Sequence, residues 1–252
     1  MNIKAIDTHM HIFHETKYEP QKNELESAYL DIFTKLSEGA GIDKMFCSTY
    51  ASVESTEPVE EENEYLFKLV QEVEGLYQWV VIDPRNEKTF QQADRILGHG
   101  KCVGIKLHPV DHKYSLSEFG DKIFSFASVH KAIIQIHPET DADYILPFAN
   151  RYPDVTFIMA HLGSYGVSDS RAIEGAKYGN VYGDTSGMAS FKNLVIEYTV
   201  GRVGSERILF GTDTYAPGAQ RGRIEYALIS DEDKENILRK NAERLFGRFL
   251  NK

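Results

Sequence analysis

Short apolar segments alternate with amphipathic segments along the whole chain. The apolar segments have the length of strands and are rich in Val, Ile, Phe and Tyr: 3–9, 44–50, 77–83, 102–108, 132–137, 156–161, 181–185 and 207–212. Between them lie stretches with apolar residues three and four positions apart, which predict helices over 24–38, 61–74, 88–97, 117–131, 142–151, 169–178, 190–200, 223–228 and 231–249. Ser230 and Asp233 predict a capping box at the start of the last helix.

Strands that alternate with helices predict a parallel sheet. Eight strand–helix units in 252 residues match the size of a (β/α)₈ TIM barrel, so we predict one such barrel, regular or distorted, as a single domain over 1–252. An open doubly wound sheet is the alternative architecture. It favours a glycine-rich loop after the first strand, whereas this strand continues into DTHMHIFHE, which contains no glycine.

Composition and charge narrow the class of protein. The chain has 28 basic and 38 acidic residues, and its net charge of −10 argues against a general nucleic-acid binder. It has no apolar run of about 18 residues, and the first residues, MNIKAIDTHMHIF, lack the apolar region and cleavage site of a signal peptide, so we expect none. Cys47 and Cys102 lie in apolar segments and are expected to be buried thiols of a reducing compartment. We therefore expect a soluble cytoplasmic protein that binds a small molecule, not a nucleic acid or a membrane, with a homo-oligomer left open.

Candidate chemistry gathers at the predicted strand ends. A TIM barrel carries its active site at the C-terminal ends of its strands. Five of the nine histidines lie at or near such an end, and an aspartate follows the eighth strand: His9, His11, His108, His137, His161 and Asp213. Residues two apart in a strand face the same side, so the two histidines of the first strand should converge.

This set of side chains predicts a metal centre. The pair His9–Met10–His11 alone is also compatible with one buried core histidine and one loop histidine. The joint pattern of imidazoles and a carboxylate at several strand ends instead favours a divalent transition metal such as zinc, iron(II) or manganese. No thiolate belongs to the set, so an open position for water is expected rather than a closed structural site.

Seven motifs in order along the chain carry a resemblance to a known family: DTHMH, GIKLHP, QIHPE, FIMAHLG, NVYGDTSG, RILFGTDTYAPG and NAERLFG. Together they resemble the amidohydrolase superfamily, in the amidohydrolase-related branch that includes aminocarboxymuconate-semialdehyde decarboxylase, resorcylate decarboxylases and pyrone-dicarboxylate lactonase. The resemblance implies a metal-dependent TIM barrel in which His9, His11, His137 and Asp213 bind the metal. It also implies that His161 orients water or transfers protons. Zinc is the first expectation for the metal, with manganese or iron(II) as alternatives.

The fourth strand leaves several roles open. The resemblance admits Lys106 as a carboxylated bridge between two metals, although members of this branch usually hold one. Lys106 is also a candidate to bind a substrate carboxylate, or to pair with an acidic group inside the barrel. His108 is predicted to line the pocket rather than to bind the metal. Weaker candidates for the site are Glu139, Asp184, Arg85, Arg221 and Arg223.

Four functions compete. The first expectation is a hydrolase of a small ester, lactone or amide that carries a carboxylate, with Asp213 as general base and then acid and with His161 stabilising charge or positioning water. The second is a non-oxidative decarboxylase of an unsaturated or aromatic acid, which the ligand set alone does not separate from the first. A metal-dependent nuclease conflicts with the net charge and with GIKLHP. A non-catalytic binding barrel conflicts with the complete ligand set.

Overall fold

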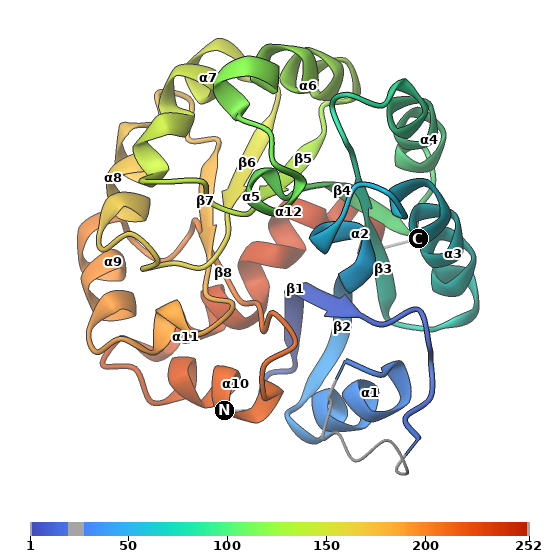
Figure 1. The fold of residues 1–252 in the computed structure, drawn as a ribbon. Coiled ribbons are helices and arrows are strands. Elements are labelled where there is room, and N and C mark those ends of the chain that lie inside the picture. The colour runs from blue at the N-terminus through green and yellow to red at the C-terminus, as the bar shows by residue number, and fades with distance from the viewer. Residues whose placement is uncertain (1, 20–27, 251–252) are drawn as a thin grey trace.

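Eight parallel strands form one sheet, ordered β1 to β8 as in the sequence. The computed structural model describes residues 2–19 and 28–250. The strands are β1 (Ala5–Ile12), β2 (Ile42–Thr49), β3 (Leu76–Val81), β4 (Cys102–Leu107), β5 (Ile133–Ile136), β6 (Thr156–Met159), β7 (Val181–Asp184) and β8 (Ile208–Leu209). Figure 1 shows the sheet curled into a barrel with the helices around it. The predicted (β/α)₈ barrel is confirmed.

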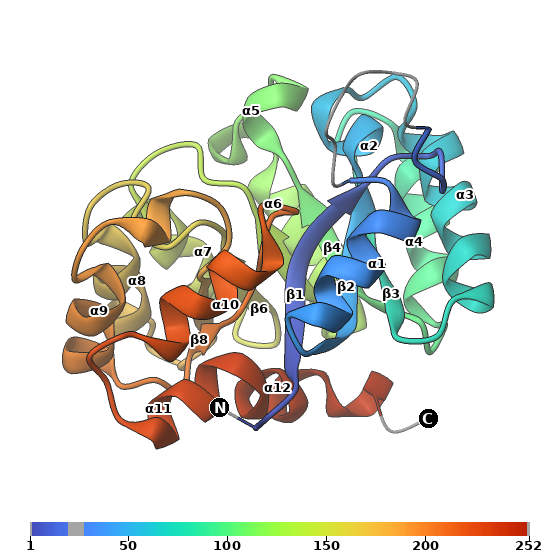
Figure 2. The same cartoon turned by 90° about the horizontal axis from the view of Figure 1, so that it is seen from below.

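Helices follow the strands on the outside of the barrel. The longer ones are α1 (Leu30–Gly39), α3 (Val59–Glu72), α4 (Glu87–Leu97), α6 (Leu116–His130), α7 (Leu146–Arg151), α8 (Ser168–Gly175), α9 (Val195–Val203) and α10 (Pro217–Glu225). Two short helices, α2 (Tyr50–Glu54) and α5 (Pro109–His112), lie at the C-terminal end of the strands, whereas α12 (Asn241–Leu250) crosses the opposite end (Figure 2). Apolar residues of the sheet and the helices pack between the two layers.

The eighth strand, Ile208–Leu209, is shorter than the predicted segment 207–212, and the chain turns sharply after that segment. Asp213 and Thr214 have left-handed backbones, with φ of 55° and 64°, and such angles end a strand. The segment after β8 also joins the two edges of the sheet. Asp213 N donates to His9 O at 2.7 Å and Thr8 N donates to Phe210 O at 2.9 Å, so a few backbone hydrogen bonds join β8 and its loop to β1.

Helix boundaries differ from the prediction in several places. The predicted helix 24–38 lies partly outside the described residues, and α1 begins only at Leu30. The predicted helix 223–228 is wrong, since α10 spans Pro217–Glu225. The last segment divides into α11 (Asp231–Glu235), a π-helical turn (Asn236–Lys240) and α12, and the predicted capping box of Ser230 and Asp233 is confirmed.

The interior of the barrel changes character along its axis. At the N-terminal end it is apolar, where Phe46 and Trp79 pack against Phe246 of α12. Towards the C-terminal end it contains buried polar groups such as His9 and Lys106, each 0% exposed. Because buried polar groups are costly unless they find partners, this half of the interior is the natural place for a functional site.

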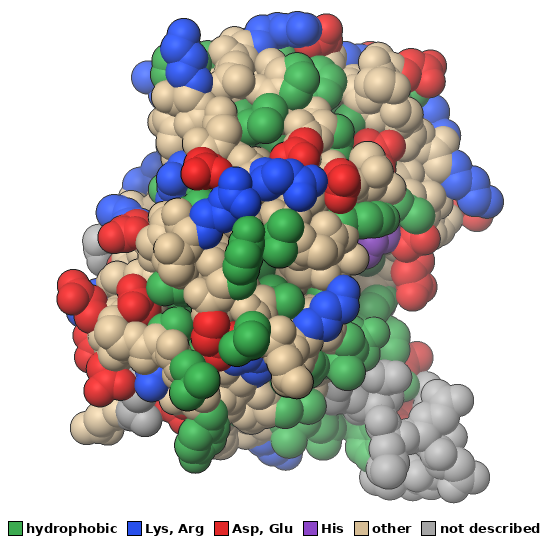
Figure 3. Space-filling view, turned by 90° about the vertical axis from the view of Figure 1, so that its left-hand side faces the viewer, with side chains coloured by type: hydrophobic (Ala, Val, Ile, Leu, Met, Phe, Trp, Pro, Cys, Tyr) green, Lys and Arg blue, Asp and Glu red, His purple; other side chains and the backbone are tan. Residues whose placement is uncertain are grey.

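The outer surface mixes side-chain types. Figure 3 shows the face over α8 and α9, where hydrophobic side chains stand in small groups among acidic and basic ones. Arg202 pairs with Glu174 across these two helices, and Arg223 of α10 pairs with Glu197 of α9. No helix within 2–19 and 28–250 combines the length and the hydropathy that crossing a membrane would require.

Candidate metal centre

Two histidines of β1 face the barrel interior together. The strand extends to Ile12, past its predicted end at residue 9, so His9 and His11 both lie inside it, two residues apart. Their Nε2 atoms are 3.2 Å apart, and the side chains are buried. The expected convergence of the two imidazoles is present in the structure, and it follows from the two-residue period of a strand.

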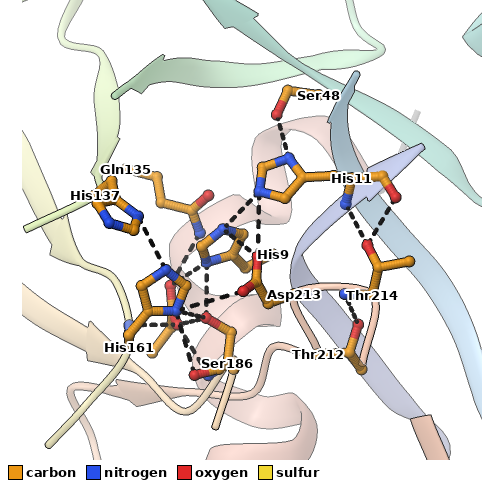
Figure 4. Close-up of polar contacts among 12 residues, drawn as sticks. His9, His11, Ser48, Gln135, His137, His161, Ser186, Thr212, Asp213 and Thr214 are labelled. Atoms are coloured by element: carbon orange, nitrogen blue, oxygen red, sulfur yellow. Dashed lines mark hydrogen bonds and ion pairs between the residues drawn. The ribbon is translucent and has the colours of Figure 1, made fainter. Parts of the chain in front are cut away.

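The loop after β8 brings a carboxylate to this pair. Asp213 Oδ1 lies 3.3 Å from His11 Nε2 and 3.6 Å from His9 Nε2. Thr214 fastens the loop, because its Oγ1 accepts from His11 N at 2.8 Å and donates to His11 O at 2.7 Å. The ligand atoms of His9, His11 and Asp213 lie within 4.8 Å of one another, close enough to hold a metal ion (Figure 4).

His137 and His161 stand beside this group and contact each other. His137 Nδ1 and His161 Nε2 are 3.2 Å apart, and the His161 ring centroid is 5.0 Å from that of His9. Among the described residues, the ligand atoms that lie within 4.8 Å of one another include His161 in one group but do not include His137. The role of His137 as a ligand therefore stays a prediction.

Lys106 points into the same space from β4. Its side chain is fully buried, and Nζ lies 2.7 Å from His9 Nε2 and 3.2 Å from Gln135 Oε1. Burial lowers the pKa of Lys106 to about 8, against the opposing effect of the carboxylates of Asp184 and Asp213. Its direct partners are thus a neutral ring and an amide, and the acidic groups act from further away.

His108 lies next to the predicted ligands. Its ring stacks on His137 with centroids 3.9 Å apart, and its Nδ1 is 3.2 Å from Asp111 Oδ2. Burial, together with His137 and Lys106, holds the pKa of His108 well below its usual range. The structure therefore places His108 at the wall of the site.

The end of β7 supplies supporting groups that sequence reasoning largely missed. Asp184, a weak candidate, has Oδ2 at 3.0 Å from His9 Nδ1. Ser186, which was not predicted, has Oγ at 2.8 Å from His9 Nδ1 and 3.0 Å from His161 Nδ1. Ser48 of β2 contacts His11 Nδ1 at 2.9 Å. A signal was available, because Ser186 follows Asp184 by two residues, as His11 follows His9.

The remaining candidates have other partners. Arg85 binds Asp83 and the carbonyl of His112. Glu139 accepts from the backbone N–H of Leu116 at 3.1 Å. Arg221 donates to carbonyls that include Ile3 O and Gly41 O, before β1 and before β2. Arg223 binds Ser190 O and Glu197. These contacts are structural, and none involves the cluster of His9, His11 and Asp213.

Electrostatics prepares the site for a cation. Burial and the charge of Lys106 lower the pKa of His9 to about 3. Burial and the nearby His161 and Lys106 lower the pKa of His137 to about 3 as well. Burial alone would raise the pKa of Asp213, but the hydrogen bond from His11 and the nearby His9 and His161 bring it below its usual range. Neutral imidazoles and ionised carboxylates are the states that bind metals.

The barrel is similar to solved structures of aromatic-acid decarboxylases. A dihydroxybenzoic acid decarboxylase from Polaromonas sp. JS666, with manganese and 2-nitroresorcinol, is 18% identical over 99% of this chain and 98% of its own, with a TM-score of 0.75. A 2,6-dihydroxybenzoate decarboxylase from Rhizobium is 15% identical over 99% of both chains, with a TM-score of 0.74. A 5-carboxyvanillate decarboxylase from Sphingomonas paucimobilis is 14% identical over 98% of this chain and 99% of its own, with a TM-score of 0.71.

At such identities the likeness establishes the fold. A search of curated proteins finds no match. The family itself is settled by the sequence, because the model of a family described as amidohydrolase matches residues 6–248, nearly the whole chain. The matched region includes every residue of the metal centre and all eight strands, apart from Ala5 at the start of β1. The chain therefore belongs to the amidohydrolase family.

Proposed function

We propose that the protein is a metal-dependent, non-oxidative decarboxylase of an aromatic or unsaturated carboxylic acid. One observation carries the proposal: a buried ammonium group, Lys106, lies in the same interior space as the histidine–aspartate group of His9, His11 and Asp213. A metal ion and a buried cation together suit a substrate carboxylate. The names of the similar solved structures, which are decarboxylases of hydroxylated aromatic acids, support this function over hydrolysis.

The donor set fits a single divalent cation. His9, His11, His137 and Asp213 are the proposed ligands, and three of the similar structures contain manganese. Imidazole and carboxylate ligands suit manganese, zinc and iron(II), so we propose one of these, with zinc or manganese first. When bound, the metal supplies Lewis acidity for a substrate oxygen.

The chain's own residues then provide binding and proton transfer. Lys106 binds the substrate carboxylate, and His108 forms the wall of the pocket beside His137. Asp213 takes up a proton from solvent and delivers it to the carbon that carried the carboxylate. In that step the carbon–carboxylate bond breaks, CO₂ leaves, and the new carbon–hydrogen bond takes up the electron pair. His161 lies 4.0 Å from Asp213 Oδ2 and stabilises charge during the transfer.

Hydrolysis is the second candidate function. It is favoured by the place of Asp213 Oδ1 beside Nε2 of both His9 and His11, where a carboxylate is well placed to take a proton from water. The substrate would be a small ester, lactone or amide that carries a carboxylate, so that Lys106 keeps the same role. The two functions share the site and differ in which bond breaks.

The test is a paired assay of the metal-loaded protein. Hydroxylated benzoates and unsaturated acids are assayed for CO₂ release, and matching esters, lactones and amides are assayed for hydrolysis. In D₂O, a decarboxylase places one deuterium on the carbon that carried the carboxylate, and mass spectrometry of the product detects it. Decarboxylation with this deuterium supports the proposal. Hydrolysis of the esters or lactones without any CO₂ release would contradict it and favour the second candidate.

A further inference from the structure

Ser186 lies between the imidazoles of His9 and His161 and the carboxylate of Asp184. We infer that it is a positioning residue for the tautomers of the two imidazole rings. It is fully buried, two residues after the end of β7. Its hydroxyl contacts Asp184 Oδ1, His9 Nδ1 and His161 Nδ1. Figure 4 shows it beneath both rings. The inference rests on the metal centre proposed above, but not on which reaction that centre catalyses.

The hydrogen-bond inventory around the hydroxyl assigns the protons. A serine hydroxyl has one proton and accepts through its lone pairs. Ser186 donates its proton to the carboxylate of Asp184, which can only accept when ionised. The serine oxygen must then be the acceptor in its hydrogen bonds with His9 Nδ1 at 2.8 Å and His161 Nδ1 at 3.0 Å. Each imidazole therefore carries its proton on Nδ1.

Other partners give the same assignment independently. His161 Nδ1 lies 3.3 Å from the carbonyl oxygen of Ser186, which can only accept. His9 Nδ1 lies 3.0 Å from Asp184 Oδ2. Asp184 itself receives donors on both oxygens, from His161 N and Ser186 N on Oδ1 and from Gln135 on Oδ2. This pattern fits an ionised carboxylate that accepts at every position.

The consequence reaches the proposed metal ligands. With its proton on Nδ1, His9 keeps a lone pair on Nε2, the atom that faces His11 and Asp213. His161 likewise keeps a lone pair on Nε2, which accepts from His137 Nδ1 at 3.2 Å. His137 is then also protonated on Nδ1, and its Nε2 is left with a lone pair for a metal. The hydroxyl and Asp184 together thus order the lone pair of His9, and the hydroxyl orders that of His137 through His161.

The same geometry argues against a second cation site at this point. The ligand atoms of His9, His161 and Asp184 lie within 4.8 Å of one another, as a metal site requires. Ser186 Oγ, however, already contacts all three residues, and hydrogen bonds account for the short distances. The structure assigns this group to the support of the ligands rather than to a second metal.

Two measurements test the inference, with Ser190→Ala as the matched control. Ser190 is equally buried and lies in the 3₁₀ turn Ala189–Phe191 that follows, but its Oγ donates to Thr185 O at 2.7 Å and contacts Gly187 O. The first measurement is nitrogen-15 NMR of the metal-free protein with labelled histidines, which reports the tautomer of each ring. The second is the affinity for Mn²⁺ or Zn²⁺, measured by competition with a chelator.

In the wild type we expect the Nδ1–H tautomer at His9, His161 and His137. In Ser186→Ala, His9 should keep this tautomer because Asp184 Oδ2 still accepts from Nδ1. His161 retains only the 3.3 Å contact with the carbonyl of residue 186 and should become a mixture of the two tautomers. His137, which contacts His161 Nε2, should then become a mixture as well. Metal affinity should fall by about 10-fold or more, and Ser190→Ala should stay within about twofold of wild type.

Three results would overturn the inference. One is an Nε2–H tautomer at His161 or His137 in the wild type, which needs no variant. Another is a Ser186→Ala protein with unchanged tautomers, and the third is metal affinity equal to that of Ser190→Ala. A wild type that binds no metal but has the expected tautomers would instead contradict the proposed function and leave the assignment of the protons intact.

Discussion

Lys106 Nζ lies 2.7 Å from His9 Nε2, the ring atom that also faces His11 and Asp213. The ammonium group and a metal ion cannot share one lone pair, so metal binding at His9 requires Lys106 to release it. Gln135 Oε1, which lies 3.2 Å from Nζ, would then be the remaining partner of the ammonium group, which would be available to a carboxylate. If the proposed site is correct, metal loading and substrate binding should therefore be coupled through this one contact.

Replacing Lys106 by Met should separate these two effects. The substitution keeps the length of the side chain and removes its charge. We expect binding of small carboxylates to the metal-loaded protein to weaken by about 2–5 kcal/mol, because the charge pair is desolvated, whereas metal affinity stays the same or rises. Calorimetric titration with small carboxylates and their matching amides measures both. Lys68→Met, on the exposed surface of α3, is the control. Equal affinity for acids and amides in the wild type would show that Lys106 is structural.

The double substitution His9→Ala, His11→Ala should remove the metal while the barrel stays folded. Both side chains lie at the C-terminal end of the interior, away from the apolar packing around Phe46 and Trp79. Roughly one divalent ion per chain is expected in the wild type and much less than one in the variant, as measured by elemental mass spectrometry. Alanine at both His99 and His130 controls for the loss of two histidines elsewhere. Unchanged metal content in the His9 and His11 variant would disprove the assignment.

Asp213→Asn should cost about 100-fold or more in turnover even when excess metal restores occupancy, because the amide cannot act as a base. The backbone at this position has φ of 55°, a conformation that Asn adopts readily, so the substitution should not distort the turn. Turnover is measured with the best substrate from the paired assay, beside the surface variant Asp231→Asn. Near-wild-type turnover would move the proton transfer to another group, with His161 the first to be tested.

Glu197 and Arg223 should make a pH-dependent contribution to stability. The hydrogen bonds from Arg223, at 2.8 Å and 3.2 Å, lower the pKa of Glu197 from 4.5 to about 2. A lowered pKa stabilises the folded state above about pH 4.5, and this stabilisation is lost as the pH falls towards 2. With partial screening by solvent we expect about 1–2 kcal/mol at pH 7.

Urea unfolding of wild type and Glu197→Gln measures this contribution between pH 7 and 3. The difference between the two proteins should be largest at pH 7 and should shrink at acidic pH. Glu174→Gln provides the control, because its pair with Arg202 is more exposed, with 54% of the glutamate side chain accessible. A difference that stays constant with pH would show that Glu197 acts through packing and not through its charge.

Much of the fold follows from local patterns in the sequence. The alternation of strands and helices, the same-face pairing of His9 and His11, and the capping box at Ser230 depend on residues a few positions apart. Such features are set by the two-residue period of a strand, the period of a helix, and hydrogen bonds within one turn. For the same reason, the fold class and the convergence of His9 and His11 could be predicted, and the motifs along the chain pointed to the family that its sequence matches.

The tertiary structure decided how these residues meet. Asp213 reaches the histidines through a left-handed turn after β8, and Thr214 fastens that turn to β1. The contact of Lys106 with His9, and the place of Ser186 between two rings, join strands that are far apart in the sequence. Hydrogen bonds over such separations depend on the closure and register of the whole barrel, which no local period encodes. The sequence by itself therefore determined which side chains face the interior. Only the assembled barrel determined which atoms of those side chains form hydrogen bonds with one another.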